Sequence, residues 1–140
     1  MTAFLDQTAA VISRLEANFA TLPVVIDNDD ASDKDLTSGY VYCEVVWQDA
    51  RQASINGPNP LFRHTGVVNI EINTPVNQGQ GTGLTYAATI AAIFRGQSFS
   101  DLLFFAPSIV VAQRQSNQYG EFWMTPVICG FQYDEHFSIM

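Results

Sequence analysis

The residues best suited to do chemistry in this chain gather in a glycine-rich turn. Gly79, Gly81 and Gly83 follow an alternating run typical of a strand and precede an apolar run typical of a helix. A glycine turn that leads into a helix can cradle a phosphate group. A P-loop would need lysine and then serine or threonine after the last glycine, but Leu84 and Thr85 stand there, and a dinucleotide fingerprint would need glycine at Leu84. We therefore expect these glycines to allow a sharp turn and close packing of the helix.

A second group of candidates is a run of five aspartates between positions 27 and 35, interrupted by one lysine. Clustered carboxylates can bind calcium, but an EF-hand loop beginning at Asp27 would need glycine at Ser32 and glutamate at Ser38. Zinc would need more ligands than the two cysteines and two histidines that lie scattered along the chain. We therefore expect a solvated acidic loop, with no metal and no cofactor.

The candidate nucleophiles are Cys43 and Cys129, and the candidate bases are His64 and His136. Both cysteines fall on apolar faces of predicted strands, which indicates buried free thiols. A pair of either cysteine with His64 stays open as an alternative, and it would need an exposed thiol. The sequence has no Gly-x-Ser-x-Gly motif. These observations predict a protein that is not an enzyme.

The composition predicts a single soluble domain over residues 1–140. Hydrophobic residues make up 47% of the chain, which is enough for a core without disulfides. The net charge of −8 argues against binding to the DNA phosphate backbone and to an anionic membrane. The sequence shows no signal peptide and no apolar run long enough to span a bilayer, so we expect synthesis in a reducing cytoplasm.

The elements that must position these residues follow from the hydrophobic periodicity. Helices are expected over 3–20 and 84–95, and strands over 24–27, 40–47, 63–73, 107–115 and 122–131, with 99–105 undecided and a long connection over 48–62. The order α-β-β-β-α-β-β predicts an α+β fold, with a mixed or antiparallel sheet and two helices packed on it. Thr2 and Thr82 are the expected N-caps, Gly96 the expected C-cap, and Pro126 predicts an edge or a bulge.

The two helices differ in how their apolar residues are arranged. The first has one expected inward stripe, made of Leu5, Ala9, Ile12, Leu15, Phe19 and Leu22. The second has a stripe of Leu84, Ala87, Ala88, Ala91 and Phe94, and it carries Tyr86, Ile90 and Ile93 largely off that stripe. A helix that is apolar nearly all round is buried on two sides. We therefore expect Tyr86, Ile90 and Ile93 to face a neighbouring subunit.

Taken in order, these segments resemble the tail terminator proteins of long-tailed bacteriophages. The resemblance is carried by the Arg-His-Thr-Gly opening of the strand at 63–72, the turn Gly79-Gln-Gly-Thr-Gly83, the helix at 84–94 and Gly120-Glu-Phe-Trp123 before the last strand. It covers nearly the whole chain as a pattern, without a strict signature. It implies a small α+β structural protein of the virion tail, assembled in the host cytoplasm. Such proteins form rings, typically hexamers, with no catalytic residues.

The resemblance also implies partners. The ring would cap the last ring of tail tube protein, stop its polymerisation and offer a surface to the head-side connector, and DNA would pass through without specific binding. The expected contact residues are the arginines Arg51, Arg63, Arg95 and Arg114 and the loop residues Asp29, Asp30, Asp33, Asn56, Asn59 and Phe62. For each arginine the alternative is an ordinary surface position or a pair within the chain. Two alternatives remain, another neck, tail completion or minor tail protein, and a small nucleotide-binding enzyme that uses Gly79–Gly83.

Overall fold

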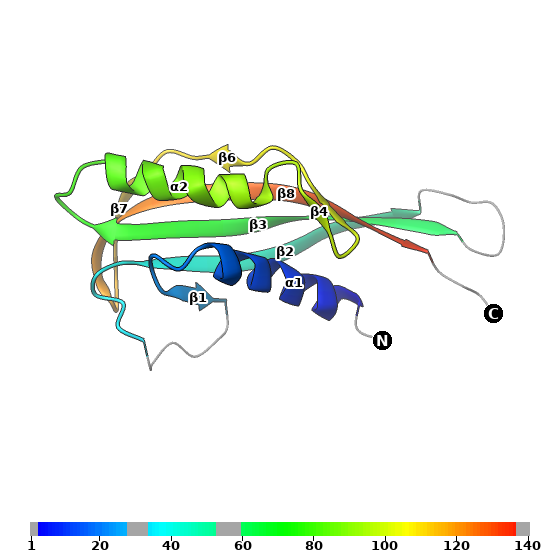
Figure 1. Cartoon of the computed structure of the whole chain (residues 1–140), viewed down its shortest axis with the longest axis horizontal. Helices are drawn as coiled ribbons and strands as arrows, with labels where there is room; N and C mark the ends of the chain where they lie inside the picture. The colour runs from blue at the N-terminus through cyan, green and yellow to red at the C-terminus, as the bar shows by residue number, and fades with distance from the viewer. Residues whose placement is uncertain (1–2, 28–33, 53–59, 137–140) are drawn as a thin grey trace.

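The computed structural model describes residues 3–27, 34–52 and 60–136. The elements are α1 (Ala3–Asn18), β1 (Val24–Ile26), β2 (Tyr40–Gln52), β3 (Leu61–Pro75), α2 (Gly81–Phe94), β4 (Ser98–Phe99), β5 (Leu102–Phe104), β6 (Ser108–Ile109), β7 (Gln113–Asn117) and β8 (Gly120–His136). Both helices pack on one face of a curled sheet (Figure 1). The predicted α+β class is therefore confirmed, and the C-terminal third holds more strands than the sequence indicated. Within the described residues, neither helix is long and apolar enough to cross a bilayer.

The sheet is mixed, because β1 pairs parallel to β2 while the other pairings are antiparallel. The strand order is β1-β2-β3-β8-β5-β4, and β6 and β7 also pair with β8. One edge of the 17-residue β8 lies along β3, and its other edge takes β7, β6 and β5 in succession. At one end, residues 51–52, 61–63 and 134–136 continue as a three-stranded arm beyond the helices and β5 (Figure 1).

The central strands form where the alternation of residue types predicts them. Val68, Ile70 and Ile72 of β3 are fully buried, and Val41 and Cys43 of β2 lie in the same core. Both strands run further than expected, to Gln52 in β2 and from Leu61 in β3, so the connection over 48–62 is shorter than predicted. The register of β2 shifts at a bulge between Trp47 and Asp49, and the strand then continues into the arm, where its residues are polar.

The buried face of α1 differs from the predicted stripe. Val11, Leu15 and Phe19 are buried at spacings of four residues, whereas Leu5 is 65% exposed. Ala9 is also exposed, and Ile12 is only half-buried. The predicted and the observed stripes share Leu15 and Phe19. Periodicity therefore located the buried side of the helix approximately, and the angle at which α1 docks on the sheet determined which neighbouring positions are buried. The expected N-cap Thr2 lies outside the described residues.

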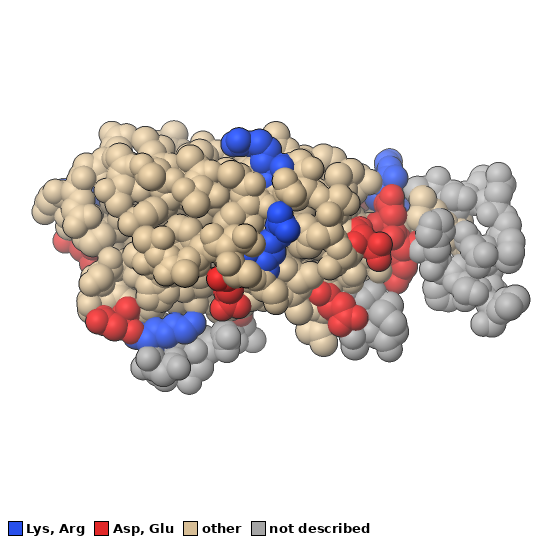
Figure 2. Space-filling view, viewed as in Figure 1, with Lys and Arg blue, Asp and Glu red and all other residues tan. Residues whose placement is uncertain are grey.

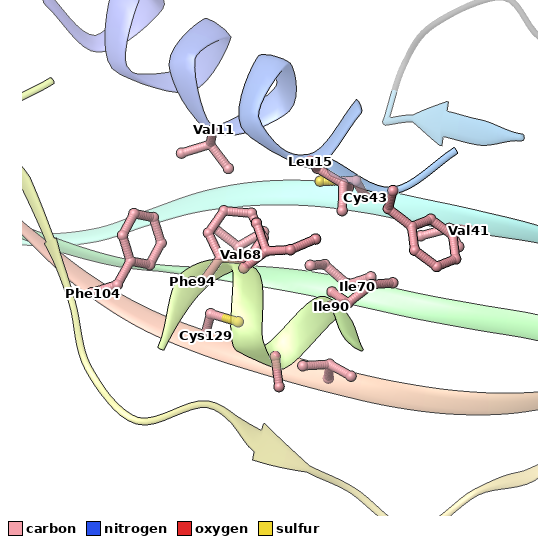
Figure 3. Packing of buried hydrophobic residues seen from close by; sticks show 14 of the residues in the cluster. Val11, Leu15, Val41, Cys43, Val68, Ile70, Ile90, Phe94, Phe104 and Cys129 are labelled. Carbon is pink, nitrogen blue, oxygen red and sulfur yellow. The ribbon is translucent and has the colours of Figure 1, made fainter. Parts of the chain in front are cut away.

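The start and end of α2 are set by glycines more than by a capping side chain. The helix begins at Gly81 after Gln80, which makes no side-chain cap bond, so Thr82 lies inside the helix and its predicted capping role is wrong. At the other end Gly96 has φ +61°, the left-handed conformation expected just after a helix. Figure 3 shows Ile90 and Phe94 of α2 in the same buried cluster as Val11 and Leu15 of α1, over the strands that both helices cover.

The C-terminal third resolves the ambiguous segments. Residues 99–105 contain a tight hairpin, in which Ser100 and Asp101 both have positive φ between β4 and β5. The strand expected over 107–115 is divided into β6 and β7. Pro126 pairs opposite Glu71 in an unbroken register, so it makes no bulge with β3. It falls in the gap between the β6 and β7 pairings, where a missing N–H is tolerated as at an edge.

Gly66 is the position in β3 where only glycine fits. A Cβ there would lie 2.4 Å from the Val46 carbonyl oxygen and 2.7 Å from Cζ of Phe131. We expect Gly66→Ala to lower the free energy of unfolding by about 2–3 kcal/mol, because backbone and a core ring must both shift. Gly81→Ala is the control, since a Cβ there meets nothing within 4 Å, and it should stabilise by about 0.5 kcal/mol. Urea unfolding of both variants checks this, and equal stabilities would contradict the packing described.

Candidate functional site

The thiols and the histidine of the described chain are engaged in structure. Cys43 and Cys129 are free and buried, and burial raises the pKa of each thiol to about 12, so neither is a thiolate at neutral pH. His64 stacks on Tyr133, and its Nε2 lies 3.2 Å from Oε1 of Glu135. The imidazole therefore pairs with a carboxylate rather than with either thiol. His136 ends β8, and its side chain lies outside the described residues.

The acidic loop is described only at its two ends, because Asp29, Asp30 and Asp33 lie outside the described residues. At one end Asp27 accepts a hydrogen bond from the Tyr42 hydroxyl, which raises the pKa of Tyr42. At the other end Lys34 donates to the Val24 carbonyl oxygen at 2.7 Å. Within the described ranges, no group of three His, Cys, Asp or Glu side chains is arranged to hold a metal ion.

The glycine turn serves packing, as predicted. Gly79 has φ +79°, and a Cβ on Gly83 would lie 2.6 Å from Oγ1 of Thr125 on β8. The first turn of α2 therefore rests directly on the sheet. The hollow beside the turn measures about 200 Å³ and is lined in part by Arg114 and Trp123. It is smaller than the roughly 300–1,000 Å³ of sites for ligands of nucleotide size.

The residues of α2 that we expected at a subunit interface lie in the chain's own core. Ile90 is fully buried and Ile93 is 9% exposed. Tyr86 is half-buried and meets Phe19 edge to face, with ring centroids 5.7 Å apart. The choice of face was therefore wrong for Ile90 and Ile93, because the curled sheet and α1 together cover both apolar sides of α2. The side that α2 leaves exposed carries Leu84, Thr85, Ala88, Thr89 and Ala92.

The four arginines expected at contacts divide into two kinds. Arg63 forms a two-pronged ion pair with Asp134, with distances of 2.8 and 3.0 Å, and this bond raises the pKa of Arg63. Arg51, Arg95 and Arg114 are exposed, and their guanidinium groups have no partner among the described residues. Of the expected loop contacts, Asn56 and Asn59 lie outside the described residues, and Phe62 is half-buried on β3.

The second face of the sheet, opposite the helices, forms a surface that the sequence did not single out. Tyr42 and Glu44 of β2 and Asn69 and Glu71 of β3 line a shallow hollow there with Pro126, Ile128 and neighbouring residues. Burial, followed by the charge of Glu44, raises the pKa of Glu71. Three exposed apolar side chains, Leu103, Phe105 and Ile128, belong to the same face by strand alternation.

A separate apolar surface lies beside α2, and we call it the outer apolar edge. It consists of Leu84 and the run Ile109, Val110 and Val111, all at least 40% exposed, with Val111 at 86%. These residues line one groove together with Gln80, Ala112 and Trp123. The sequence signal for this surface is the run of three consecutive β-branched residues. Because side chains alternate along a strand, three consecutive residues cannot all face the core.

Comparisons with known proteins cover most of the chain. A family model described as phage tail terminator protein matches residues 7–131. Among solved structures, one chain of 19% identity superimposes with a TM-score of 0.60, covering 91% of this chain and 94% of its own. At that identity the likeness concerns the fold alone. No protein with a curated description matches this chain.

The burial of Ile90 predicts the effect of shortening its side chain. Ile90→Ala should cost about 2–5 kcal/mol of unfolding free energy, because it leaves a cavity under α2. Leu84→Ala on the same helix should cost less than about 1 kcal/mol, since Leu84 is 46% exposed. Denaturant unfolding measures both. If Ile90→Ala left the stability unchanged and weakened self-association, the result would support the subunit interface that we first expected at Ile90.

The raised pKa of Glu71 predicts a pH-dependent stability. Its folded-state pKa lies above the unfolded value, so ionisation opposes folding at neutral pH and has no effect below the unfolded pKa. Glu71→Gln should therefore raise the melting temperature at pH 7, by about 1–3 °C, and leave it unchanged near pH 3. Glu44→Gln should give part of the same gain at pH 7. A gain for Glu71→Gln that is equal at both pH values would refute this account.

Proposed function

The chain belongs to the phage tail terminator family, and we propose that it forms a ring of six copies that caps the tail tube. It is a structural component of the phage tail. In the proposed assembly the ring sits on the last ring of tube protein, halts its polymerisation and presents its other side to a head-side connector. Each chain acts as one domain over its full length. The proposal is supported by the family match over residues 7–131.

One structural observation carries the proposal. Exposed large apolar side chains form three separate groups on the described surface: Phe4 and Leu5, the outer apolar edge, and Leu103, Phe105 and Ile128. A contiguous exposed apolar patch marks an interaction site on a soluble protein. A subunit of a ring between the tube and the head needs several such sites, because it meets two neighbouring copies, the tube and the connector.

The charge of the chain suits the passage of DNA. Six copies at −8 each carry 6 × −8, or about −48 charges, a field that repels phosphate. The basic residues are few, and Arg63 is already paired with Asp134. DNA therefore crosses the ring without specific binding. A ring whose pore is lined by unpaired arginines would contradict this part of the proposal.

The ring and its position predict two measurements. Light scattering of the purified chain should give a mass near six times 15.4 kDa, and negative-stain images should show a closed ring with a central hole. Added to polymerising tube protein, the chain should bind tube ends and shorten the tubes. A chain that binds elsewhere and leaves tube length unchanged would favour another neck, tail completion or minor tail protein. A stable monomer that binds nucleotide would favour the enzyme alternative.

A further inference from the structure

The sheet has an unpaired border along β6 and β7, which is apolar at β6 and in the residues between the two strands, whereas β7 itself is polar. These strands pair with β8 on one side, and no further strand of the described chain pairs with their other side. The run from Phe105 to Ala112 contains no charged residue, and Ile109, Val110 and Val111 are exposed within it. Figure 2 shows no acidic side chain on the surface over α2 and β6. An open edge of this composition associates with another chain unless it is covered.

The opposite border of the sheet is open as well, and its charge is different. β1 covers β2 only from Val41 to Cys43, and no described strand pairs with the outer side of 44–51. This stretch carries Glu44 and Asp49, with Arg51 at its end. The β6–β7 border carries Arg114 on β7 instead, and its guanidinium has no partner in the described chain. The two borders are therefore complementary in charge.

The strand directions also match. β2 is antiparallel to β3, β3 to β8, and β8 to both β6 and β7, so β6 and β7 run opposite to β2. A copy related by rotation about an axis along the strands keeps its strand direction. Its β2 would therefore lie antiparallel to β6 and β7 of the first copy, the arrangement that extends an antiparallel sheet. If the sheet had one strand fewer between the two borders, the border strands of neighbouring copies would run parallel instead.

The two open borders lie at different heights along the strands. Ser108 and Glu44 are level, because Ser108 pairs with Ile128, and Glu44 reaches Ile128 through Asn69. From that level the β6–β7 border extends toward the start of β8, whereas the open part of β2 extends toward the end of β8. Copies that join these borders must therefore be shifted along the strands. A closed ring allows this shift when its strands tilt relative to the ring axis, as in a closed barrel.

We propose that the β6–β7 border of one copy, with its outer apolar edge, docks against the outer border of β2 in the next copy. The inference rests on the proposed ring and names its subunit contact. Contacts between two different borders propagate head to tail and close into a ring when the rotation fits. The bulge between Trp47 and Asp49 interrupts a continuous ladder, so the side chains of the borders supply much of the contact.

Two surface substitutions test the contact. Val111→Glu places a charge in the proposed contact at a side chain that is 86% exposed in the single chain. It should weaken self-association by about tenfold or more and leave thermal unfolding of the monomer unchanged. Ala17→Glu adds the same charge at an exposed position of α1 outside both borders, and association should persist. A wild-type chain that forms rings, with rings unaffected by Val111→Glu, overturns this contact but not the ring. A wild-type chain that stays monomeric at all concentrations overturns both.

Cysteine pairing identifies the facing border. Chains with Val111→Cys are mixed with chains that carry Val46→Cys, Asp49→Cys or Arg51→Cys, and are then oxidised. The native thiols give little background, because Cys43 and Cys129 are buried and their pKa values are raised to about 12. At least one mixed pair should form a disulfide between different chains. Exclusive Val111→Cys homodimers, which a two-fold contact of the apolar edges would give, overturn the proposal.

Discussion

The antiparallel pairing of β3 with β8 is the interaction on which the rest of the structure depends. It runs without a shift from Leu61 opposite His136 to Pro75 opposite Phe122, and it joins segments more than 45 residues apart. Both helices pack on the face that these strands share with β2. The pairing requires Gly66, because the ring of Phe131 and the Val46 carbonyl occupy the space that a Cβ would fill.

The length of β8 explains both the order and the openness of the sheet. Because β8 is much longer than the strands on its second side, β5, β6 and β7 share that edge in turn. Apart from β4, which pairs with β5, no strand of the described residues covers their outer sides. The arm formed by the ends of β2, β3 and β8 is held by side-chain pairs, and Phe4 at the start of α1 packs against its base. There Arg63 pairs with Asp134, and His64 lies between Glu135 and the rings of Phe4, Trp47 and Tyr133.

The residues best suited to chemistry are thus used for structure. The two thiols are core residues, the imidazole of His64 belongs to an aromatic cluster, and the glycine turn brings α2 onto β8. The surface, by contrast, combines apolar groups with few charges and two open sheet borders of opposite character. These features suit a protein whose work consists of contacts with copies of itself and with other proteins, in agreement with its membership of a tail terminator family.

The two helices, the central strands and the resemblance to the family could be predicted from the residues alone, whereas the short strands β4 to β7 could not. Alternation along β2 and β3 identified their buried faces, and the glycines after Thr74-Pro75 marked the turn into α2. Which sides of the helices are covered depends on how the chain packs in three dimensions. Ile90 and Ile93 extended the apolar arc of α2 beyond one stripe, and the sequence could not distinguish a neighbouring subunit from the chain's own core. Periodicity measures how much of a helix is apolar, whereas the curl of the sheet and the position of α1 determine what buries it.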